Sequence, residues 1–451
     1  MLKKTVKCTV RRSVTGAVMR TATWLALAAA SLAQAQDNRV DTIRIDAPEL
    51  AKYGKFAIGV KTLTMTNPKQ LDILKAKAGE PIPSYDRPLT VEVWYPGKAS
   101  DALSSGQYRT QIRDGKTETI LSGKATRDGA AETSGAPYPL VIISHGYPGN
   151  RFLLSHLAEN LASKGYVVAS IDHTDSTYSD QGAFGSTLLN RPLDQLFVLN
   201  EMAKLNANDP GNTLKGLVNA DNTALIGYSM GGYGVVNTIG GGFTSTVVAS
   251  PLAPPNTALA ARQAGSASHT ASMDPRIKAA VAFAPWGWNR GFWDAAGLSA
   301  IKTPVFYLAG SVDDVSGYSP GVRNIYEGSV NAPRFLLTYE NANHNAGAPI
   351  PAPREALNPP AGVTSNPANH YIDAVWDNVR MNNIAQHFTT VFLGKYLKSD
   401  ASMDSYLSLV ENAKDGKWSA ETTGALKADH TYWKGFANRT AAGLRLEQKK
   451  P

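Results

Sequence analysis

The chain has 451 residues, of which 43% are hydrophobic and 18% charged, so it is long enough to bury a large core without disulfide support. Its formal net charge of +8 falls to +2 when residues 1–35 are set aside, because that segment contains six basic and no acidic residues. The remainder carries no basic stripe with interleaved aromatic residues, which argues against a nucleic-acid partner. The single cysteine, Cys8, also lies in 1–35, so the rest of the chain has no disulfide and no thiolate metal ligand.

Residues 1–35 have the organisation of a secretory signal peptide. Basic residues precede an apolar run at 24–32, and Ala33-Gln34-Ala35 follows it. The apolar run is too short to span a bilayer. We therefore expect an exported protein, periplasmic or extracellular, without stable membrane insertion, and the sequence leaves the export route open.

The next part of the chain changes character twice. Residues 36–87 mix short apolar runs with turn residues and indicate an N-terminal extension, so the main domain is expected at 88–451. The alternating pattern at 88–96 predicts a half-exposed strand near a sheet edge. The polar, glycine-rich stretch 97–135 predicts a surface loop with room for a small hairpin.

From residue 139 onwards, buried strands alternate with helical patterns. Strands are predicted at 139–144, 166–171, 224–226, 277–284, 304–309 and 334–339, with helices between them. This order predicts an α/β fold with a mainly parallel central sheet flanked by helices.

Three stretches depart from the alternation. Residues 240–274 read as an irregular insertion near the mouth of a site, and whether they form a lid is open. The helical pattern at 375–392 predicts a long amphipathic C-terminal helix that covers the sheet. The basic tail after Leu446 is expected to fray.

The segment Gly227-Tyr228-Ser229-Met230-Gly231 follows a buried strand and leads into a helical stretch. This is the context of a nucleophile elbow, in which a serine sits on a sharp strand-to-helix turn and small residues are needed on either side. We predict that Ser229 is a nucleophile.

A serine nucleophile needs a histidine base and a carboxylate that orients it. Asp313 follows the strand at 304–309 and His344 follows the next strand, where sites in open α/β sheets assemble. The adjacent Asp314 is the alternative to Asp313. The order serine, aspartate, histidine is that of the α/β-hydrolases.

The oxyanion of an acyl-transfer reaction needs two N–H donors. The sequence predicts the backbone N–H of Met230 and that of Tyr147, since Pro148 has no N–H. His145 is predicted to buttress this loop, and His173 is predicted to support the site without acting in catalysis.

The densest aromatic cluster, at 286–293, makes Trp286 and Trp288 candidates for substrate binding, with a purely structural role as the equal alternative. No histidine pair stands at metal-ligand spacing and no phosphate-binding loop is present in the sequence, so neither a metal nor a cofactor is expected.

Together these motifs resemble those of the serine α/β-hydrolases. Within that superfamily, V-E-V-W-Y-P, I-I-S-H-G-Y-P-G-N-R, R-P-L-D, G-Y-S-M-G-G and N-A-N-H are similar to predicted dienelactone hydrolases and platelet-activating-factor acetylhydrolase-like esterases of bacteria. The elbow also resembles that of bacterial cutinases and polyester hydrolases. The resemblance implies hydrolysis of small or polymeric carboxylic esters through an acyl-enzyme. Dienelactone hydrolases use cysteine where this chain has Ser229.

The sequence thus predicts an exported serine carboxylesterase. A lipase, phospholipase or peptidase on the same three residues remains an alternative, because the carbonyl chemistry is shared. A non-catalytic binding protein on a hydrolase scaffold is the alternative outside the enzymes. Acyl and alcohol specificity and oligomeric state stay open.

Overall fold

The computed structural model describes residues 38–99, 106–359, 363 and 366–451, so the expected signal peptide lies outside the described residues. The strands are β1 Ala57–Leu71, β2 Ser84–Gly97, β3 Gly106–Gln111, β4 Glu118–Gly123, β5 Thr126–Arg127, β6 Tyr138–Ser144, β7 Val167–Asp172, β8 Val218–Tyr228, β9 Ile277–Phe283, β10 Val305–Gly310, β11 Arg334–Tyr339 and β12 Leu444–Lys449. The α-helices are α2 Ser155–Ala162, α3 Phe184–Ala207, α4 Met230–Thr238, α5 Ser245–Val248, α6 Ala267–Ala271, α7 Ala295–Leu298, α8 Arg323–Gly328, α9 Arg354–Leu357 and α10 Asn378–Lys398.

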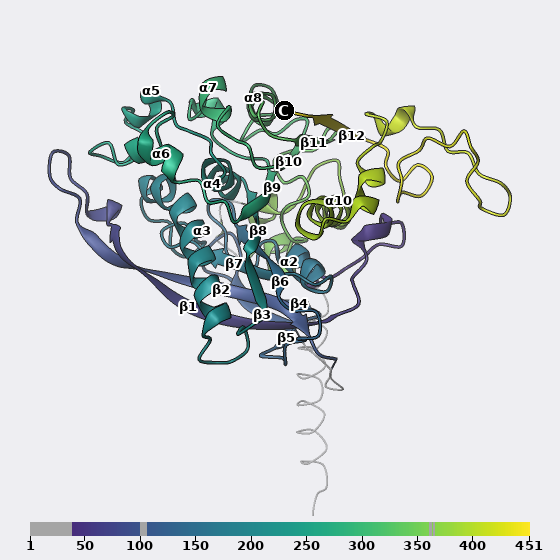
Figure 1. Ribbon diagram of the computed structural model, residues 1–451, viewed down its shortest axis with the longest axis horizontal. Helices are drawn as coiled ribbons and strands as arrows, with labels where there is room; N and C mark the ends of the chain where they lie inside the picture. The colour runs from purple at the N-terminus through teal and green to yellow at the C-terminus, as the bar shows by residue number, and fades with distance from the viewer. Residues whose placement is uncertain (1–37, 100–105, 360–362, 364–365) are drawn as a thin grey trace, which may run out of the picture.

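A ten-stranded sheet forms the centre of the molecule, with the order β12-β11-β10-β9-β8-β6-β7-β2-β1-β5. The adjacent strands β11, β10, β9, β8, β6 and β7 run parallel to one another. The outer strands β2, β1 and β12 pair antiparallel. Helices α3 and α4 lie on one side of the sheet, and α2 and α10 lie on the other (Figure 1). The predicted α/β fold with a mainly parallel, helix-flanked sheet is confirmed.

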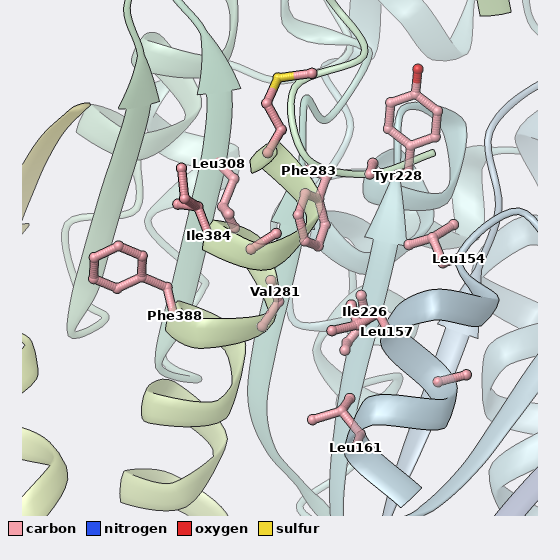
Figure 2. Close-up of a cluster of buried hydrophobic side chains, with 14 of the residues drawn as sticks. Leu154, Leu157, Leu161, Ile226, Tyr228, Val281, Phe283, Leu308, Ile384 and Phe388 are labelled. Atoms are coloured by element: carbon pink, nitrogen blue, oxygen red, sulfur yellow. The ribbon is translucent and has the colours of Figure 1, made fainter. Parts of the chain in front are cut away.

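Alternate residues of the central strands supply the two hydrophobic cores. Ile226 of β8 and Val281 of β9 pack with α2 and α10, whereas Leu225 belongs to the core under α3 and α4. Figure 2 shows Leu157 of α2 and Ile384 of α10 over the first of these faces. Each such fully buried side chain contributes roughly 1.5–3 kcal/mol to folding, so the central strands anchor the loops that follow them.

The strand predicted at 88–96 does not lie at a sheet edge. It is part of β2, which is paired on both sides by β1 and β7, and its residues from Val91 to Gly97 are buried. Strand β1 pairs antiparallel with β2 on its outer side. It comes from the segment expected to be an N-terminal extension. The division into an extension at 36–87 and a main domain at 88–451 stays a prediction.

The C-terminal tail does not fray. Residues 444–449 form β12, which pairs antiparallel with β11. Leu444 and Leu446 are buried there, so two apolar side chains hold the basic tail to the sheet.

The stretch 97–135 contains the hairpin of β3 and β4, whose Tyr108 and Leu121 are buried in the core.

Among the helices of the described residues, none combines the length and the apolar character that crossing a bilayer requires.

Candidate active site

Ser229 stands on the turn between β8 and α4. Its backbone has φ 54° and ψ −113°, a conformation that non-glycine residues rarely adopt. Its N–H donates to the carbonyl oxygen of Phe283 at 2.9 Å, and its own carbonyl accepts from the N–H groups of Tyr233 at 2.9 Å and Trp286 at 3.2 Å. These three bonds hold the strained backbone in place.

The glycines on either side of Ser229 are required by space. A Cβ atom on Gly227 would collide with the backbone of Gly231, and one on Gly231 would collide with the carbonyl oxygen of Ser144. The turn therefore closes tightly against β6, as expected for a nucleophile elbow.

His344 lies between Ser229 and Asp313. Its Nε2 atom is 2.9 Å from Oγ of Ser229, and its Nδ1 atom is 3.0 Å from both carboxylate oxygens of Asp313. All three residues are at least 92% buried, since their exposed fractions are 7% for Ser229 and Asp313 and 8% for His344. The loop after β10 carries Asp313 and the loop after β11 carries His344, and both loops meet the end of β8 that carries Ser229.

Asp313 is paired with His344, whereas Asp314 has no ion-pair partner among the described residues. The Asp313 carboxylate also accepts from the N–H groups of Val315 at 2.9 Å and Ser316 at 2.8 Å. Burial would raise the pKa of Asp313, but His344 and these two N–H donors outweigh it and hold the pKa below its usual value. Asp314 is exposed and lies at the rim of the pocket.

Two N–H groups lie near Ser229 without a protein acceptor in the described part of the chain, those of Tyr147 and Met230. Met230 is the first residue of α4, where N–H groups have no partner within the helix. The loop of Tyr147 approaches closely, because a Cβ on Gly146 would lie 3.5 Å from Cβ of Ser229. The oxyanion-binding role expected of these two N–H groups stays a prediction.

A cavity of about 490 Å³ opens over Ser229 and His344. Arg113, Tyr147, Asn345 and His370 line it with them. Trp286 and Trp288 do not line this cavity, and neither does any residue of 240–274. Trp286 instead packs on Phe184, with ring centroids 5.6 Å apart, and Phe184 packs on Tyr147 at 5.2 Å.

The described residues contain no group of three or more His, Cys, Asp or Glu side chains that could hold a metal ion.

Two family profiles match the chain. One, described as platelet-activating factor acetylhydrolase, isoform II, matches residues 53–195, and one described as PET hydrolase-like matches residues 129–264. Cutinase 2 of Thermobifida cellulosilytica is 24% identical over 210 residues, which cover 46% of this chain and 61% of that protein. The platelet-activating factor acetylhydrolase of Bos taurus is 27% identical over 199 residues, which cover 35% of this chain and 45% of that protein.

A solved structure agrees with these matches at the level of the fold. The ferulic acid esterase from Streptomyces cinnamoneus aligns with a TM-score of 0.51 and 19% identity, over 82% of this chain and 96% of that one. Together these matches support a serine α/β-hydrolase esterase family for this chain. The chain spans about three fifths or less of the length of the cutinases and the acetylhydrolase that it matches.

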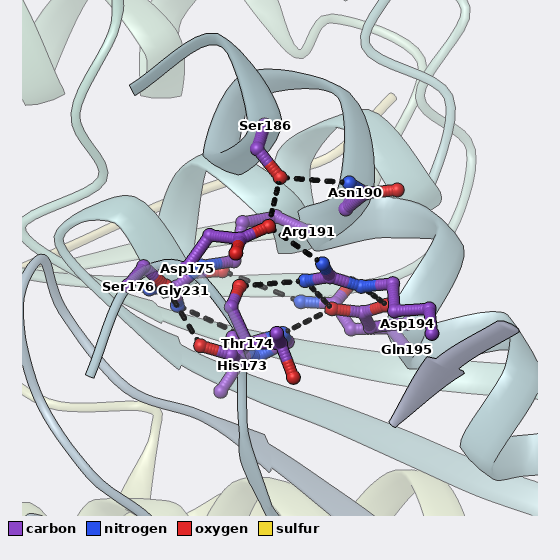
Figure 3. Close-up of polar contacts among 12 residues, drawn as sticks. His173, Thr174, Asp175, Ser176, Ser186, Asn190, Arg191, Asp194, Gln195 and Gly231 are labelled. Carbon is purple, nitrogen blue, oxygen red and sulfur yellow. Dashed lines mark hydrogen bonds and ion pairs between the residues drawn. The ribbon is translucent and has the colours of Figure 1, made fainter. Parts of the chain in front are cut away.

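Behind the Tyr147 loop, the α/β-hydrolase core contains a buried polar network (Figure 3). Arg191 of α3 donates from Nη1 to the carbonyl oxygen of His145. Its Nη2 donates to the carbonyl oxygen of Gly146 at 2.9 Å and to Oγ of Ser176 at 2.8 Å. Burial lowers the pKa of Arg191 to about 9, although Asp194 opposes that shift. Arg191 therefore fixes the backbone that presents the N–H of Tyr147.

His145 and His173 belong to the same network. The Nδ1 atom of His145 is 2.7 Å from the carbonyl oxygen of Gly146, and its Nε2 accepts from the N–H of His173 at 3.2 Å. His173 bridges Ser144 Oγ at 2.8 Å and Asp194 at 2.9 Å. Burial, followed by the charge of Arg191, lowers the pKa of His173 to about 3, so this ring is neutral. Both histidines contact the loop and neither contacts Ser229, which agrees with the supporting roles expected of them.

Sequence reasoning did not single out Arg191, Asp194 or Arg113. The first two stand in R-P-L-D, four consecutive residues in which two opposite charges occupy a helix that faces the sheet. That position is the signal that could have found them, because a buried charge needs a partner. Arg113 lies in a stretch that reads as a surface loop, and nothing local in the sequence places it beside Ser229.

Proposed function

We propose that this protein hydrolyses carboxylic esters through an acyl-enzyme on Ser229. The observation that carries the proposal is the chain of contacts from Asp313 to His344 to Ser229, with His344 2.9 Å from the hydroxyl and 3.0 Å from the carboxylate. That geometry suits removal of the serine proton during attack on a carbonyl.

In the proposed reaction, Nε2 of His344 takes the proton of Ser229 as Oγ attacks the ester carbonyl. Asp313 accepts from Nδ1–H, which fixes the tautomer and stabilises the imidazolium. The oxyanion accepts from the N–H groups of Tyr147 and Met230. His344 then gives its proton to the leaving alcohol, activates a water molecule, and the acid is released.

The similar proteins guide the choice of substrate. Two of them are named as a cutinase and a ferulic acid esterase, and a PET hydrolase-like profile matches the chain, so we propose carboxylic esters, small or polymeric, as the substrate class. We also propose that Trp286 forms part of the acyl or alcohol site through its contact with Phe184.

Export by a signal peptide at 1–35 is proposed as well, and N-terminal sequencing of protein from a secreting host tests it.

The test is hydrolysis of 4-nitrophenyl esters from acetate to palmitate by the wild type, Ser229→Ala and the control Ser299→Ala. We expect Ser229→Ala to lose about 10⁴-fold or more in kcat, since no other group can form the acyl-enzyme. Ser299 caps the C-terminus of α7 and does not line the cavity over Ser229 and His344, so Ser299→Ala should retain full activity.

A fluorophosphonate label separates inactivity from misfolding. It should modify the wild type and Ser299→Ala but not Ser229→Ala, while circular dichroism shows all three folded. Short-chain preference supports an esterase, and long-chain preference favours a lipase. Equal turnover by the wild type and Ser229→Ala would refute the mechanism.

A further inference from the structure

Arg113 lines the active-site cavity although it belongs to a hairpin outside the central sheet. It lies in the turn between β3 and β4, in the stretch that the sequence predicts to be a surface loop. The turn is tightly built, since Ile112 N–H donates to Thr117 at 3.0 Å and Asp114 accepts from the N–H groups of Lys116 and Thr117. The position of Arg113 is therefore set by the fold of the hairpin.

The hairpin is also fastened to the body of the protein. Asn150 Nδ2 donates to Oγ1 of Thr110 at 2.7 Å, which joins β3 to the loop that follows β6. A Cβ on Gly115 would collide with the carbonyl oxygen of Tyr178, so the turn presses directly against the neighbouring loop. These contacts hold the backbone of Arg113 in a fixed position beside the cavity.

The guanidinium of Arg113 has no carboxylate partner in the described part of the chain, although it lines the cavity with Ser229 and His344. Asp114, next to it, uses its carboxylate on the turn. Other arginines next to the core, such as Arg87 and Arg151, each form ion pairs. A cation without a partner in a partly desolvated pocket is available to an anionic ligand.

The described lining of the cavity offers a ligand one positive charge, at Arg113. Arg113 is the only Lys or Arg among the described residues that line it, and Asp314 adds one carboxylate at the rim. His370 adds no second positive charge, because burial, then Arg113 and His344, lower its pKa to about 3. A planar carboxylate matches one guanidinium through two parallel hydrogen bonds, whereas a phosphate dianion would need more positive charge.

We propose that Arg113 binds a carboxylate carried by the substrate, so that the preferred esters are half-esters or other esters with a free acid group. This specificity rests on the proposed esterase function. The neutral side chains of Asn369 and His370 line the same cavity.

The test compares the monoethyl and diethyl esters of succinate, adipate and suberate, with acid release followed by titration at pH 8 and low ionic strength. The wild type should prefer the monoethyl ester, by kcat/KM, at the chain length that spans the distance from Ser229 to Arg113. Arg113→Gln should lower the monoethyl-to-diethyl ratio at that length by about tenfold or more, mainly through KM, since a hydrogen bond to a charged group is lost.

Arg109→Gln is the matched control. Arg109 is on the same hairpin and carries the same charge, but its side chain is 71% exposed and pairs with Glu118 outside the cavity. The ratio should not change in this variant. A ratio that Arg113→Gln leaves at the wild-type value for all three acids overturns the proposal.

Direct binding separates this proposal from the esterase function. Ser229→Ala should bind monoethyl adipate by calorimetry, more weakly at 0.5 M salt, and Ser229→Ala/Arg113→Gln should bind it at least about tenfold more weakly. If the wild type prefers the diethyl ester to the monoethyl ester at every chain length, the carboxylate site is refuted and the esterase function is not. If it hydrolyses neither of these esters and no 4-nitrophenyl ester, the esterase function fails, and equal binding by the two variants would then refute the carboxylate site independently.

Discussion

Arg191 donates a hydrogen bond of 2.9 Å to the carbonyl oxygen of Gly146, and this contact ties helix α3 to the loop that presents the N–H of Tyr147. Arg191 and Gly146 are 45 residues apart in the chain. An oxyanion donor is useful only if its direction is fixed before the reaction begins. Arg191 is thus a positioning residue for the proposed chemistry.

We predict that Arg191→Met lowers kcat for 4-nitrophenyl butyrate by about 10²-fold with little change in KM, because a displaced N–H stabilises the transition state poorly. Arg262→Met is the control, since Arg262 is also buried and donates to a backbone carbonyl, that of Asn237, away from the Tyr147 loop. Steady-state kinetics check both variants. A loss expressed in KM alone would contradict the positioning role.

Asp194→Asn should destabilise the fold by about 3 kcal/mol, because Arg87, which is 1% exposed, loses the carboxylate that accepts two of its hydrogen bonds and keeps Asp175 as its one carboxylate partner among the described residues. Urea unfolding at pH 7 measures this. The control is Asp46→Asn, which breaks an exposed ion pair with Arg44 and should cost less than about 1 kcal/mol.

The same carboxylate predicts a pH dependence. Burial would raise the pKa of Asp194, but Arg87 and His173 outweigh it and lower the pKa in the folded protein. Its stabilisation is therefore present above the unfolded pKa of about 3.9 and is lost as the pH falls through the lower folded value. The free energy of unfolding of the wild type should fall more steeply below about pH 4 than that of Asp194→Asn. Parallel curves would contradict the assignment.

Gly231→Ala should reduce activity by more than about 10²-fold and lower the melting temperature, since its Cβ would push the elbow away from β6. In Gly394→Ala, a second helical glycine, the added Cβ meets only the flexible side chain of Met403, with Cγ at 3.0 Å. That variant should keep its activity and unfold at the same or a higher temperature, because alanine favours the helix. Calorimetry and ester kinetics distinguish the two outcomes.

Trp286→Ala should raise KM for ethyl benzoate about tenfold more than KM for ethyl acetate, since it removes the support of Phe184 beside Tyr147. Trp288→Ala should affect both substrates equally, because its ring makes no aromatic contact within the described residues. If the two variants behave alike, Trp286 has no specific part in substrate binding.

Local patterns in the sequence predicted the elements that carry the site. Ser229 follows an apolar run bounded by glycines, and Asp313 and His344 each follow a strand, so parallel pairing alone predicts that their loops share one edge of the sheet. The alternation of strands and helices likewise predicted the fold class, since hydrophobic periodicity is a property of neighbouring residues.

Long-range pairing was not predictable in this way. The position of β2 inside the sheet depends on β1, and the order of the C-terminal tail depends on β11. Local sequence also leaves Asp313 and Asp314 as alternatives, and only the folded loop puts Asp313 3.0 Å from His344 and leaves Asp314 exposed.

The sequence by itself determined the strand-turn-helix elbow at Ser229, because its glycines, apolar strand and helical continuation all act within about ten residues. The tertiary structure alone decided that Arg191 supports the Tyr147 loop and that Arg113 enters the cavity from the β3–β4 turn. Both arginines act across contacts between segments that are distant in sequence, and the energy of such contacts depends on burial and on the partners that folding brings together.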